Sequence, residues 1–223
     1  MNVVNKKIFL AFDSVVVLLL LFLLASCSNS SDKSVQSSKT AEMSKDFNVD
    51  EIDNLKINSG IMDVEIGEGS TFHLNVKYLE KRKPKIEVKS KTLNFDSKTK
   101  NLSNNNKKLG LEITLPTNKE FINFEITQSN GDVEIQRLKT QSLTISSGNG
   151  NIAINKLATT KASSISSGNA SISLSDSTVP GLNISVANGS VEVHGKEVKG
   201  KYQEGDQKQA LKITTGNGSI EVK

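Results

Sequence analysis

Cysteine, histidine and tryptophan are scarce in this chain of 223 residues, which has one Cys, two His and no Trp. A single cysteine, Cys27, excludes a disulfide framework and a structural zinc site built from several thiolates. Two histidines leave little room for catalysis through imidazole. Aromatic residues are also few, with eight Phe and two Tyr, so a large aromatic core is excluded. The composition therefore predicts no catalytic centre, no metal and no cofactor.

Charge of one sign is not in large excess either. The 28 basic and 24 acidic residues give a formal net charge of +4. Such a mild excess affects solubility and attraction to anionic surroundings, but it is not the footprint of a nucleic-acid-binding domain. Basic residues are also poorly interleaved with the aromatic residues that stack on bases. We expect no nucleic-acid partner.

One apolar run lies near the N-terminus. Lys6 and Lys7 precede the apolar stretch Val15–Leu24, and the small residues Ala25 and Ser26 follow it, before Cys27. The stretch is shorter than the roughly 20 residues that a bilayer span needs. A positive start, a short apolar region and small residues are typical of a secretory signal peptide.

The end of this segment, Leu24-Ala25-Ser26-Cys27, resembles the lipobox of bacterial lipoproteins, in which an aliphatic residue and two small residues precede a Cys. The resemblance implies cleavage between Ser26 and Cys27, with residues 1–26 as the signal peptide and a lipid on the Cys27 thiol. It places the protein on the extracytoplasmic face of a bacterial cell membrane, in a Gram-positive envelope.

A Ser-rich segment follows the predicted anchor. Residues 28–46 contain seven Ser and almost no apolar residues. This composition cannot bury enough surface to offset the entropy of ordering. Residues 27–46 are therefore predicted to form a lipid-anchored, flexible tether.

Short alternating runs dominate the remaining residues, 47–223. Apolar side chains at every second position are typical of half-buried β-strands. The clearest early runs are Asp63–Ile66, Phe72–Tyr78, Lys85–Val88, Leu109–Leu115 and Phe121–Thr127.

An internal repeat occupies residues 129–222. A turn containing Asn, usually followed by Gly, precedes a short apolar alternation five times, as in Ser147-Gly148-Asn149-Gly150 before Ile152 and Ile154. The asparagines are Asn130, Asn149, Asn169, Asn188 and Asn217, so the period is 19–20 residues except for a longer last step. Asn and Gly tolerate positive φ at low cost, so the turn needs these residue types for its backbone.

Two all-β architectures satisfy this repeat. In a parallel β-solenoid resembling a single-stranded β-helix, each repeat is one coil, and the asparagines stack as a hydrogen-bonded column about 4.8 Å apart. In the alternative, an antiparallel β-sandwich, each Asn-Gly closes a hairpin. Near-constant spacing favours the solenoid with its coils stacked in sequence order.

The repeated units from about residue 110 to 222, together with Val179-Pro180-Gly181-Leu182 before Asn188, resemble the bacterial putative-adhesin family of β-strand-repeat proteins, a domain of unknown function. The resemblance implies a solenoid on an envelope protein. It carries over no ligand-binding residue, and residues 67–108 depart from the repeat.

Three glutamates, Glu134, Glu192 and Glu221, share one column of the repeat, and Glu65 is a candidate fourth. Adjacent coils would place two such carboxylates about 5 Å apart, near the separation in retaining glycosidases. The alternation turns them toward solvent, so we interpret them as exposed strand residues. His73 and His194 take the same outward phase, and Asn130, Asp132 and Asn151 fit turns better than a calcium loop.

The stretch from Lys77 to Lys108 is rich in basic residues. A charged run usually protects an edge strand or faces solvent. The functional interpretation is attraction to anionic lipid headgroups or to an anionic cell-wall polymer. The candidate contact residues are Lys81, Arg82, Lys83, Lys85, Lys107 and Lys108.

These patterns together predict a lipid-anchored β-repeat protein that is not an enzyme. Its expected role is adhesin-like, or scaffolding and sensing in the envelope, with an envelope or host macromolecule as partner. The alternative is a polysaccharide-active enzyme on a β-helix, and a third possibility is a spacer without a ligand.

Replacing Cys27 by Ala tests the lipobox directly. In cells fed a labelled fatty acid, we expect the wild-type protein to take up label and Cys27→Ala to take up none, because the thiol is the only acceptor. Ser28→Ala is the control and should label as the wild type does. Label on the Cys27→Ala protein would contradict the lipobox.

Overall fold

The structure, a computed structural model, describes residues 39–99 and 108–223. These residues form strands β1 to β20 and two short 3-10 helices, η1 (Val49–Glu51) and η2 (Glu80–Arg82). The prediction of an all-β fold is confirmed. No helix in these two ranges has the length and apolar character required to cross a membrane. Ser26, Cys27 and the rest of the predicted signal peptide lie outside the described residues.

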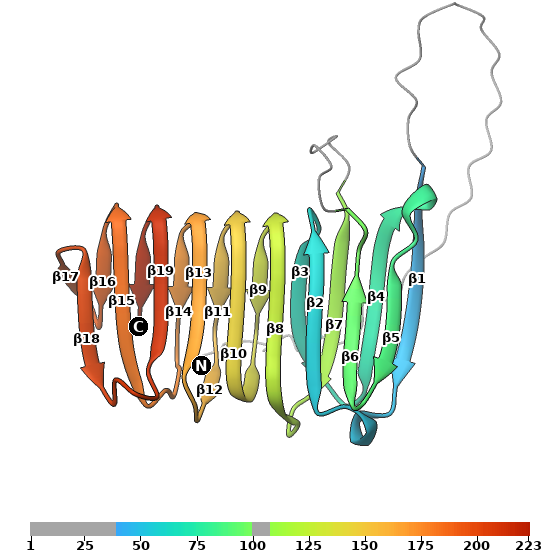
Figure 1. The fold of residues 1–223 in the computed structure, drawn as a ribbon, viewed down its shortest axis with the longest axis horizontal. Coiled ribbons are helices and arrows are strands. Elements are labelled where there is room, and N and C mark those ends of the chain that lie inside the picture. The colour runs from blue at the N-terminus through green and yellow to red at the C-terminus, as the bar shows by residue number, and fades with distance from the viewer. Residues whose placement is uncertain (1–38, 100–107) are drawn as a thin grey trace, which may run out of the picture. The chain divides into compact units, whose positions relative to one another are not determined.

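The strands form two ten-stranded sheets (Figure 1). Sheet 1 contains, in spatial order, β1 (Thr40–Phe47), β4 (Phe72–Leu79), β7 (Gly110–Pro116), β3 (Asp63–Gly69), β9 (Val133–Ile135), β11 (Ile152–Ile154), β14 (Ile172–Leu174), β20 (Ile220–Val222), β16 (Val191–Val193) and β17 (Lys196–Val198). Sheet 2 contains β18 (Lys201–Gly205), β15 (Gly181–Asn188), β19 (Leu211–Asn217), β13 (Ser163–Asn169), β10 (Leu138–Asn149), β8 (Glu120–Asn130), β2 (Asn54–Gly60), β6 (Thr92–Asp96) and β5 (Lys85–Lys89), with β12 (Leu157–Thr159) paired to β10. Each alternating run expected between residues 63 and 127 is confirmed as a strand, namely β3, β4, β5, β7 and β8.

Aliphatic side chains from the inner faces of both sheets make one continuous core. Parallel register stacks like residues on like residues: Ile145, Ile165 and Ile213 are consecutive partners in sheet 2. The same coils place Ile152 beside Ile172 in sheet 1. All five side chains are buried. Period-2 alternation therefore produces a core of aliphatic columns with few aromatic rings.

The Asn-Gly turns connect the two sheets. β10 ends at Asn149 in sheet 2, and β11 begins at Ile152 in sheet 1. Both strands then pair in parallel with the equivalent strands of the next coil. The antiparallel alternative, in which these turns close hairpins, is therefore wrong for the repeats. Antiparallel pairing occurs at the ends, where β1 and β4, β17, β5 and β18 extend the sheets.

The coils do not stack in sequence order, contrary to the expectation from the even spacing. The last strands of the chain, β19 and β20, lie between β13 and β15 in sheet 2 and between β14 and β16 in sheet 1. At the other end, β2 and β3 lie between the strands that follow them, β6 with β8 and β7 with β9. Because the repeats have similar sequences, their strands present similar edges for pairing. The spacing of the repeats therefore does not specify which strand edge a given coil pairs with.

The predicted tether is too long by several residues. β1 begins at Thr40, within the segment expected to be flexible, and pairs antiparallel with β4 along its whole length. Phe47 at its end packs against Phe72, with ring centroids 5.4 Å apart. An edge strand obtains its hydrogen bonds from one neighbour and needs little apolar area, so its polar composition did not reveal it.

The described residues, 39–99 and 108–223, belong to one compact unit. The hydrophobic core cluster lies wholly within it, from Ile52 to Val222. We therefore expect residues 39–223, called the body below, to fold without the preceding segment.

Glycine is required where one turn passes over the next. Gly150 has a φ of +118°, and a Cβ built on it would overlap the carbonyl oxygen of Gly131 in the neighbouring turn. Gly195 also has positive φ, at +73°, but a Cβ there would meet nothing within 4 Å. Substituting each of these two glycines by Ala therefore separates the free-energy cost of the positive φ from the cost of the overlap with the neighbouring turn.

Gly150→Ala should lower the free energy of unfolding of the body by about 3 kcal/mol, through dihedral strain and backbone overlap together. Gly195→Ala, which has the strain alone, should cost about 1 kcal/mol. Urea unfolding followed by circular dichroism measures both. Equal costs for the two variants would contradict the close approach of the turns.

Candidate functional site

The five repeat asparagines form one column of side-chain hydrogen bonds. Asn149 Nδ2 donates to Asn130 Oδ1 (2.8 Å), and Asn169 Nδ2 donates to Asn149 Oδ1 (2.8 Å). Asn217 Nδ2 then donates to Asn169 Oδ1 (2.6 Å), and Asn188 Nδ2 to Asn217 Oδ1 (2.9 Å). The spatial order is thus 130, 149, 169, 217, 188, because the last coil lies between two earlier ones.

The hydroxyl residue two positions before the asparagine closes the turn from inside. Ser147 Oγ donates to the carbonyl oxygen of Asn149 (3.3 Å), and Thr215 Oγ1 to that of Asn217 (3.1 Å). Gln128 fills this position in the first repeat, and its Nε2 donates to Gly131 O and to Ser147 Oγ. Ser147 and Thr215 are therefore buried donors to their turns, whereas the equivalent Ser167 Oγ is buried without a hydrogen-bond partner.

The prediction that the turn needs Asn for its tolerance of positive φ is wrong. The residues with positive φ in the turns are Gly131, Gly150, Gly189 and Gly218, and no repeat asparagine is among the positive-φ residues. The asparagines are extended strand residues whose amides have both a donor and an acceptor. The column, and not a left-handed dihedral, is what requires Asn there.

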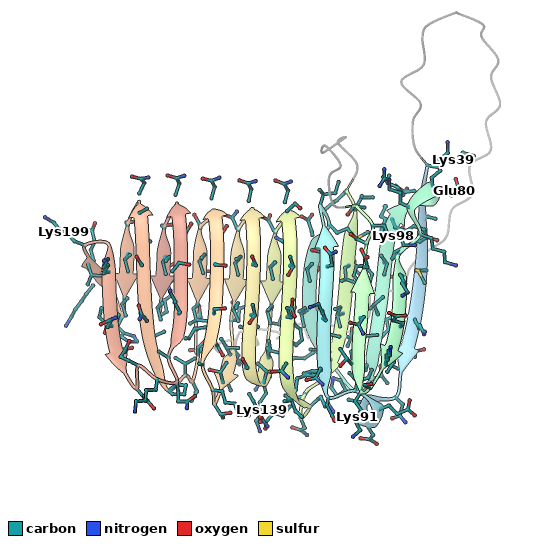
Figure 2. The ribbon with its side chains drawn as sticks, viewed as in Figure 1. Lys39, Glu80, Lys91, Lys98, Lys139 and Lys199 are labelled. Atoms are coloured by element: carbon teal, nitrogen blue, oxygen red, sulfur yellow. The ribbon has the colours of Figure 1, made fainter. Side chains whose placement is uncertain are left out.

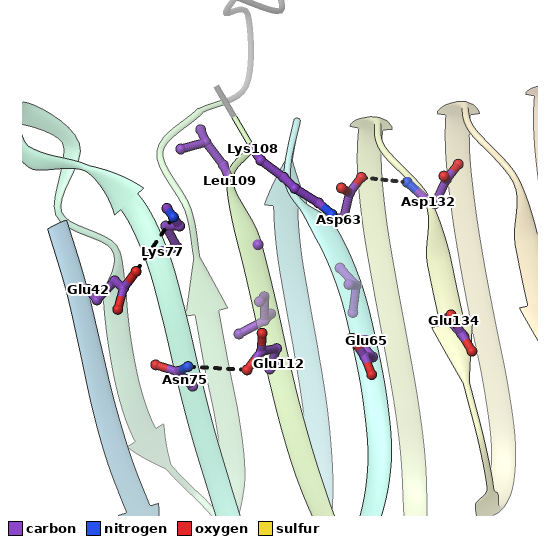
Figure 3. A pocket seen from close by; sticks show the side chains of 13 residues that line it. Glu42, Asp63, Glu65, Asn75, Lys77, Lys108, Leu109, Glu112, Asp132 and Glu134 are labelled. Carbon is purple, nitrogen blue, oxygen red and sulfur yellow. Dashed lines mark hydrogen bonds and ion pairs between the residues drawn. The ribbon is translucent and has the colours of Figure 1, made fainter. Parts of the chain in front are cut away.

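A shallow groove of about 470 Å³ lies on the outer face of sheet 1, where β1, β4, β7, β3 and β9 run side by side (Figure 3). Its polar lining consists of Glu42, Asp63, Glu65, Asn75, Lys77, Lys108, Glu112, Asp132 and Glu134. Three contacts order it: Lys77 Nζ to Glu42 Oε1 (3.6 Å), Asn75 Nδ2 to Glu112 Oε2 (3.1 Å), and the Asp132 backbone N–H to Asp63 Oδ1 (3.0 Å). The groove is open to solvent along the sheet.

A row of carboxylates crosses the groove. Glu65 is the register partner of Glu112 on one side and of Glu134 on the other. Neighbouring strands lie about 4.8 Å apart, so these like charges face each other at a cost of some tenths of a kcal/mol. Beyond the groove, Ala153 and Ser173 interrupt the row, and Glu221 and Glu192 follow as a separate pair of register partners. The arrangement offers several acceptors to a partner rich in hydrogen-bond donors.

The sequence indicated part of this row and missed the rest. The repeat placed Glu65 and Glu134 in one column, as the register now shows. Glu112 lies in an alternating run, but its place depends on the pairing of β7 with β3 and β4. The sequence predicts Glu42 to lie in the tether, because nothing local to it indicates its distant partner strand, β4.

The two histidines pair with nearby carboxylates. His73 Nδ1 lies 2.7 Å from Asp46 Oδ1, and His194 Nε2 lies 3.4 Å from Glu204 Oε1. Asp132 Oδ1 accepts from the backbone N–H of Asn151 (2.7 Å), so these two residues bridge consecutive turns. Within the described ranges, no three His, Cys, Asp or Glu side chains are grouped to hold a metal ion.

The structure places the basic residues predicted to contact an anionic surface in different environments. Lys81 and Arg82 belong to η2, Lys83 follows it, and all three are exposed. Lys85 begins β5 and pairs with Glu87 (2.8 Å). Lys108 lines the acidic groove. Lys107 lies outside the described residues.

Most of the chain matches a known protein family. The model described as Toastrack DUF4097 matches residues 52–223, which covers the two sheets except for β1. No curated protein matches the chain.

Three solved structures resemble this chain at low sequence identity, and the first of them shares its fold. A putative cell adhesion protein from Clostridium sporogenes is 19% identical, with a TM-score of 0.58, over 82% of this chain and 99% of that one. A putative adhesin from Bacteroides fragilis is 16% identical, with a TM-score of 0.38, over 84% and 98% of the two chains. A structure from Parabacteroides distasonis named a putative lipid binding protein has a TM-score of 0.28 at 16% identity, over 82% and 96%.

Asn169→Ala should destabilise the body by about 2 kcal/mol, because Asn169 bonds both Asn149 and Asn217 in the column and each hydrogen bond contributes about 1 kcal/mol. Asn188→Ala, at the end of the column with one such bond, should cost about half as much. Urea unfolding measures the difference. A neutral result at Asn169 would show that the column contributes nothing to stability.

Proposed function

This chain belongs to the Toastrack DUF4097 family, and on that premise we propose that it is a non-enzymatic, adhesin-like binding module of the bacterial envelope. A lipid on Cys27 would hold it at the extracytoplasmic face of the cell membrane, as the lipobox predicts. The partner would be a macromolecule of the envelope or of a host.

The architecture we propose for this role is a β-solenoid. Parallel pairing of equivalent strands in both sheets and the single column of asparagines support it. Such stacking turns each outward position of the repeat into a stripe along the body. A stripe suits an extended polymer better than a small molecule, because equivalent groups recur at a constant spacing.

The acidic groove carries the proposal (Figure 3). It is an open channel across five strands whose carboxylates and amide would accept and donate hydrogen bonds along a polymer. Hydroxyl groups of a polysaccharide match this lining, since carboxylates accept strongly from hydroxyl donors. An anionic polymer would be repelled by the row of Glu65, Glu112 and Glu134, so attraction to anionic groups is left to the basic residues.

The names of the solved structures agree with a surface role. Two are called adhesion proteins or adhesins. Those words describe those proteins, and the Clostridium sporogenes structure supports the shared fold alone. The proposal for this chain adds the lipobox, which implies export.

One observation favours the alternative of a polysaccharide-active enzyme. Glu65 lies between two other glutamates in the groove, so two carboxylates face each other at about the separation that retaining glycosidases use. The binding module and the enzyme would therefore use the same glutamates, and only the enzyme would release cleaved polysaccharide.

A binding assay with immobilised body distinguishes these functions. We expect envelope or host polysaccharide to bind the wild type, and Glu65→Gln with Glu134→Gln to weaken binding at least about tenfold through two lost charged acceptors. Glu192→Gln with Glu221→Gln is the matched control, since these glutamates have the same cross-strand geometry outside the groove.

Equal binding by both double variants would contradict the groove as the site. Release of new reducing ends from the polymer by the wild type, lost in the groove variant, would establish the enzyme instead.

A further inference from the structure

The chain enters the body at a basic corner. The backbone N–H of Glu80 donates to the carbonyl oxygen of Lys39 (2.9 Å), so the residue before β1 lies against the start of η2. Lys81, Arg82 and Lys83 follow directly. Figure 2 labels Lys39 and Glu80 side by side at one end of the sheets.

A distant segment completes this corner. Arg82 Nη1 donates to the carbonyl oxygen of Lys98 (3.0 Å), which draws the chain after β6 toward η2. Lys98 itself has a φ of +55° and an exposed side chain. We call Lys39, Lys81, Arg82, Lys83 and Lys98 the basic corner.

The basic corner has an uncompensated charge. All five of its side chains are exposed, and in the described part of the chain none of them forms an ion pair. Two carboxylates are close in sequence: Glu80, which begins η2, and Asp96, whose Oδ1 accepts from the Lys98 backbone N–H (2.9 Å). Five positive charges against two negative ones make this corner an attractive surface for anions.

Protection of a sheet edge explains only some of the nearby lysines. Lys85 and Lys89 lie on β5, the edge strand of sheet 2, where charged side chains discourage pairing with another chain. Lys81, Arg82 and Lys83 lie in or after η2, outside both ladders. Their charge has no such structural use.

We propose that the basic corner docks on the anionic lipid headgroups of the membrane that holds the lipid on Cys27. The proposal rests on the lipidation proposed above. Lys39 follows Cys27 by 12 residues, which reach at most about 40 Å when fully extended. The point of entry is therefore kept close to the headgroups, and a lipid chain combined with a basic patch is a stable form of anchoring.

Docking at this corner would fix the orientation of the body relative to the membrane. The corner lies at the end of the sheets formed by β1 and β5, whereas β17 and β18 form the opposite end. Figure 2 shows Lys199 at that far end. The C-terminal coils would then project away from the membrane.

Flotation of the body with vesicles tests the docking surface without the lipid anchor. We expect the wild type to bind vesicles of phosphatidylcholine and phosphatidylglycerol, to release them as salt rises, and not to bind phosphatidylcholine alone. The corner variant, Lys81→Gln, Arg82→Gln, Lys83→Gln and Lys98→Gln, should bind about 600-fold more weakly, since each of the four basic residues near an anionic surface contributes about fivefold.

The matched control removes four exposed lysines at the other end of the sheets. Lys196→Gln, Lys199→Gln, Lys201→Gln and Lys208→Gln should bind within about threefold of the wild type, although the net charge falls equally. Equal losses in the two variants would show a general charge effect and overturn the corner. Competition by soluble polyglycerol phosphate at equal phosphate concentration would assign the surface to a cell-wall polymer and overturn the lipid.

The full-length protein in membranes supplies a second readout. A water-soluble amine reagent should modify Lys81 and Lys83 several times more slowly than Lys199 and Lys201, and high salt should remove the difference. Equal rates at low salt would overturn the orientation. Because vesicle binding is measured on the unlipidated body, a failure of Cys27 labelling and a failure of corner docking are distinguishable.

Discussion

The structure depends on how closely one turn of the backbone approaches the next. Paired strands lie about 4.8 Å apart, so each turn between the sheets must fit directly over its neighbour. At Gly150 there is no space for a Cβ beneath the adjacent carbonyl. The glycine admits the backbone, the asparagine before it bonds to the next asparagine, and in two of the turns Ser147 or Thr215 donates to the turn carbonyl from inside. These residue types of the repeat therefore each meet a different structural requirement of stacking one turn on the next.

The order of the coils determines which strands form the exposed edges of the two sheets. β19 and β20 have a parallel neighbour on both sides, so the C-terminal strands of the chain are not exposed edges. The outermost positions are instead taken by antiparallel strands, such as β18 beside β15 and β5 beside β6. Edge strands rich in Lys and Glu discourage the addition of further chains. Stacking out of sequence order thus protects the end of the chain at no cost to the core.

Function would arise from what the stacking leaves on the surface. Alternation sends every second side chain outward, and parallel register aligns these side chains across strands, as in the glutamates of sheet 1. The groove forms where that row meets β4 and β1, which do not belong to the repeat. The basic corner is likewise built outside the repeat. The regular part of the chain supplies a frame, and the irregular N-terminal part supplies the chemistry proposed for partner and membrane.

Local alternation in the sequence determined most of the strands and their inward and outward faces, because these depend on residues a few positions apart, and the repeat of 19–20 residues indicated the asparagine column. The proximity of Glu65 and Glu134 could be predicted because they occupy equivalent positions of the repeat. The order of the coils, the strand at Thr40–Phe47, the groove and the basic corner were decided only by tertiary structure. They depend on which of several similar edges a strand joins, as when Glu42 lies beside Lys77 or Arg82 reaches Lys98. That choice is settled by the packing of the whole core, which no short stretch of sequence contains.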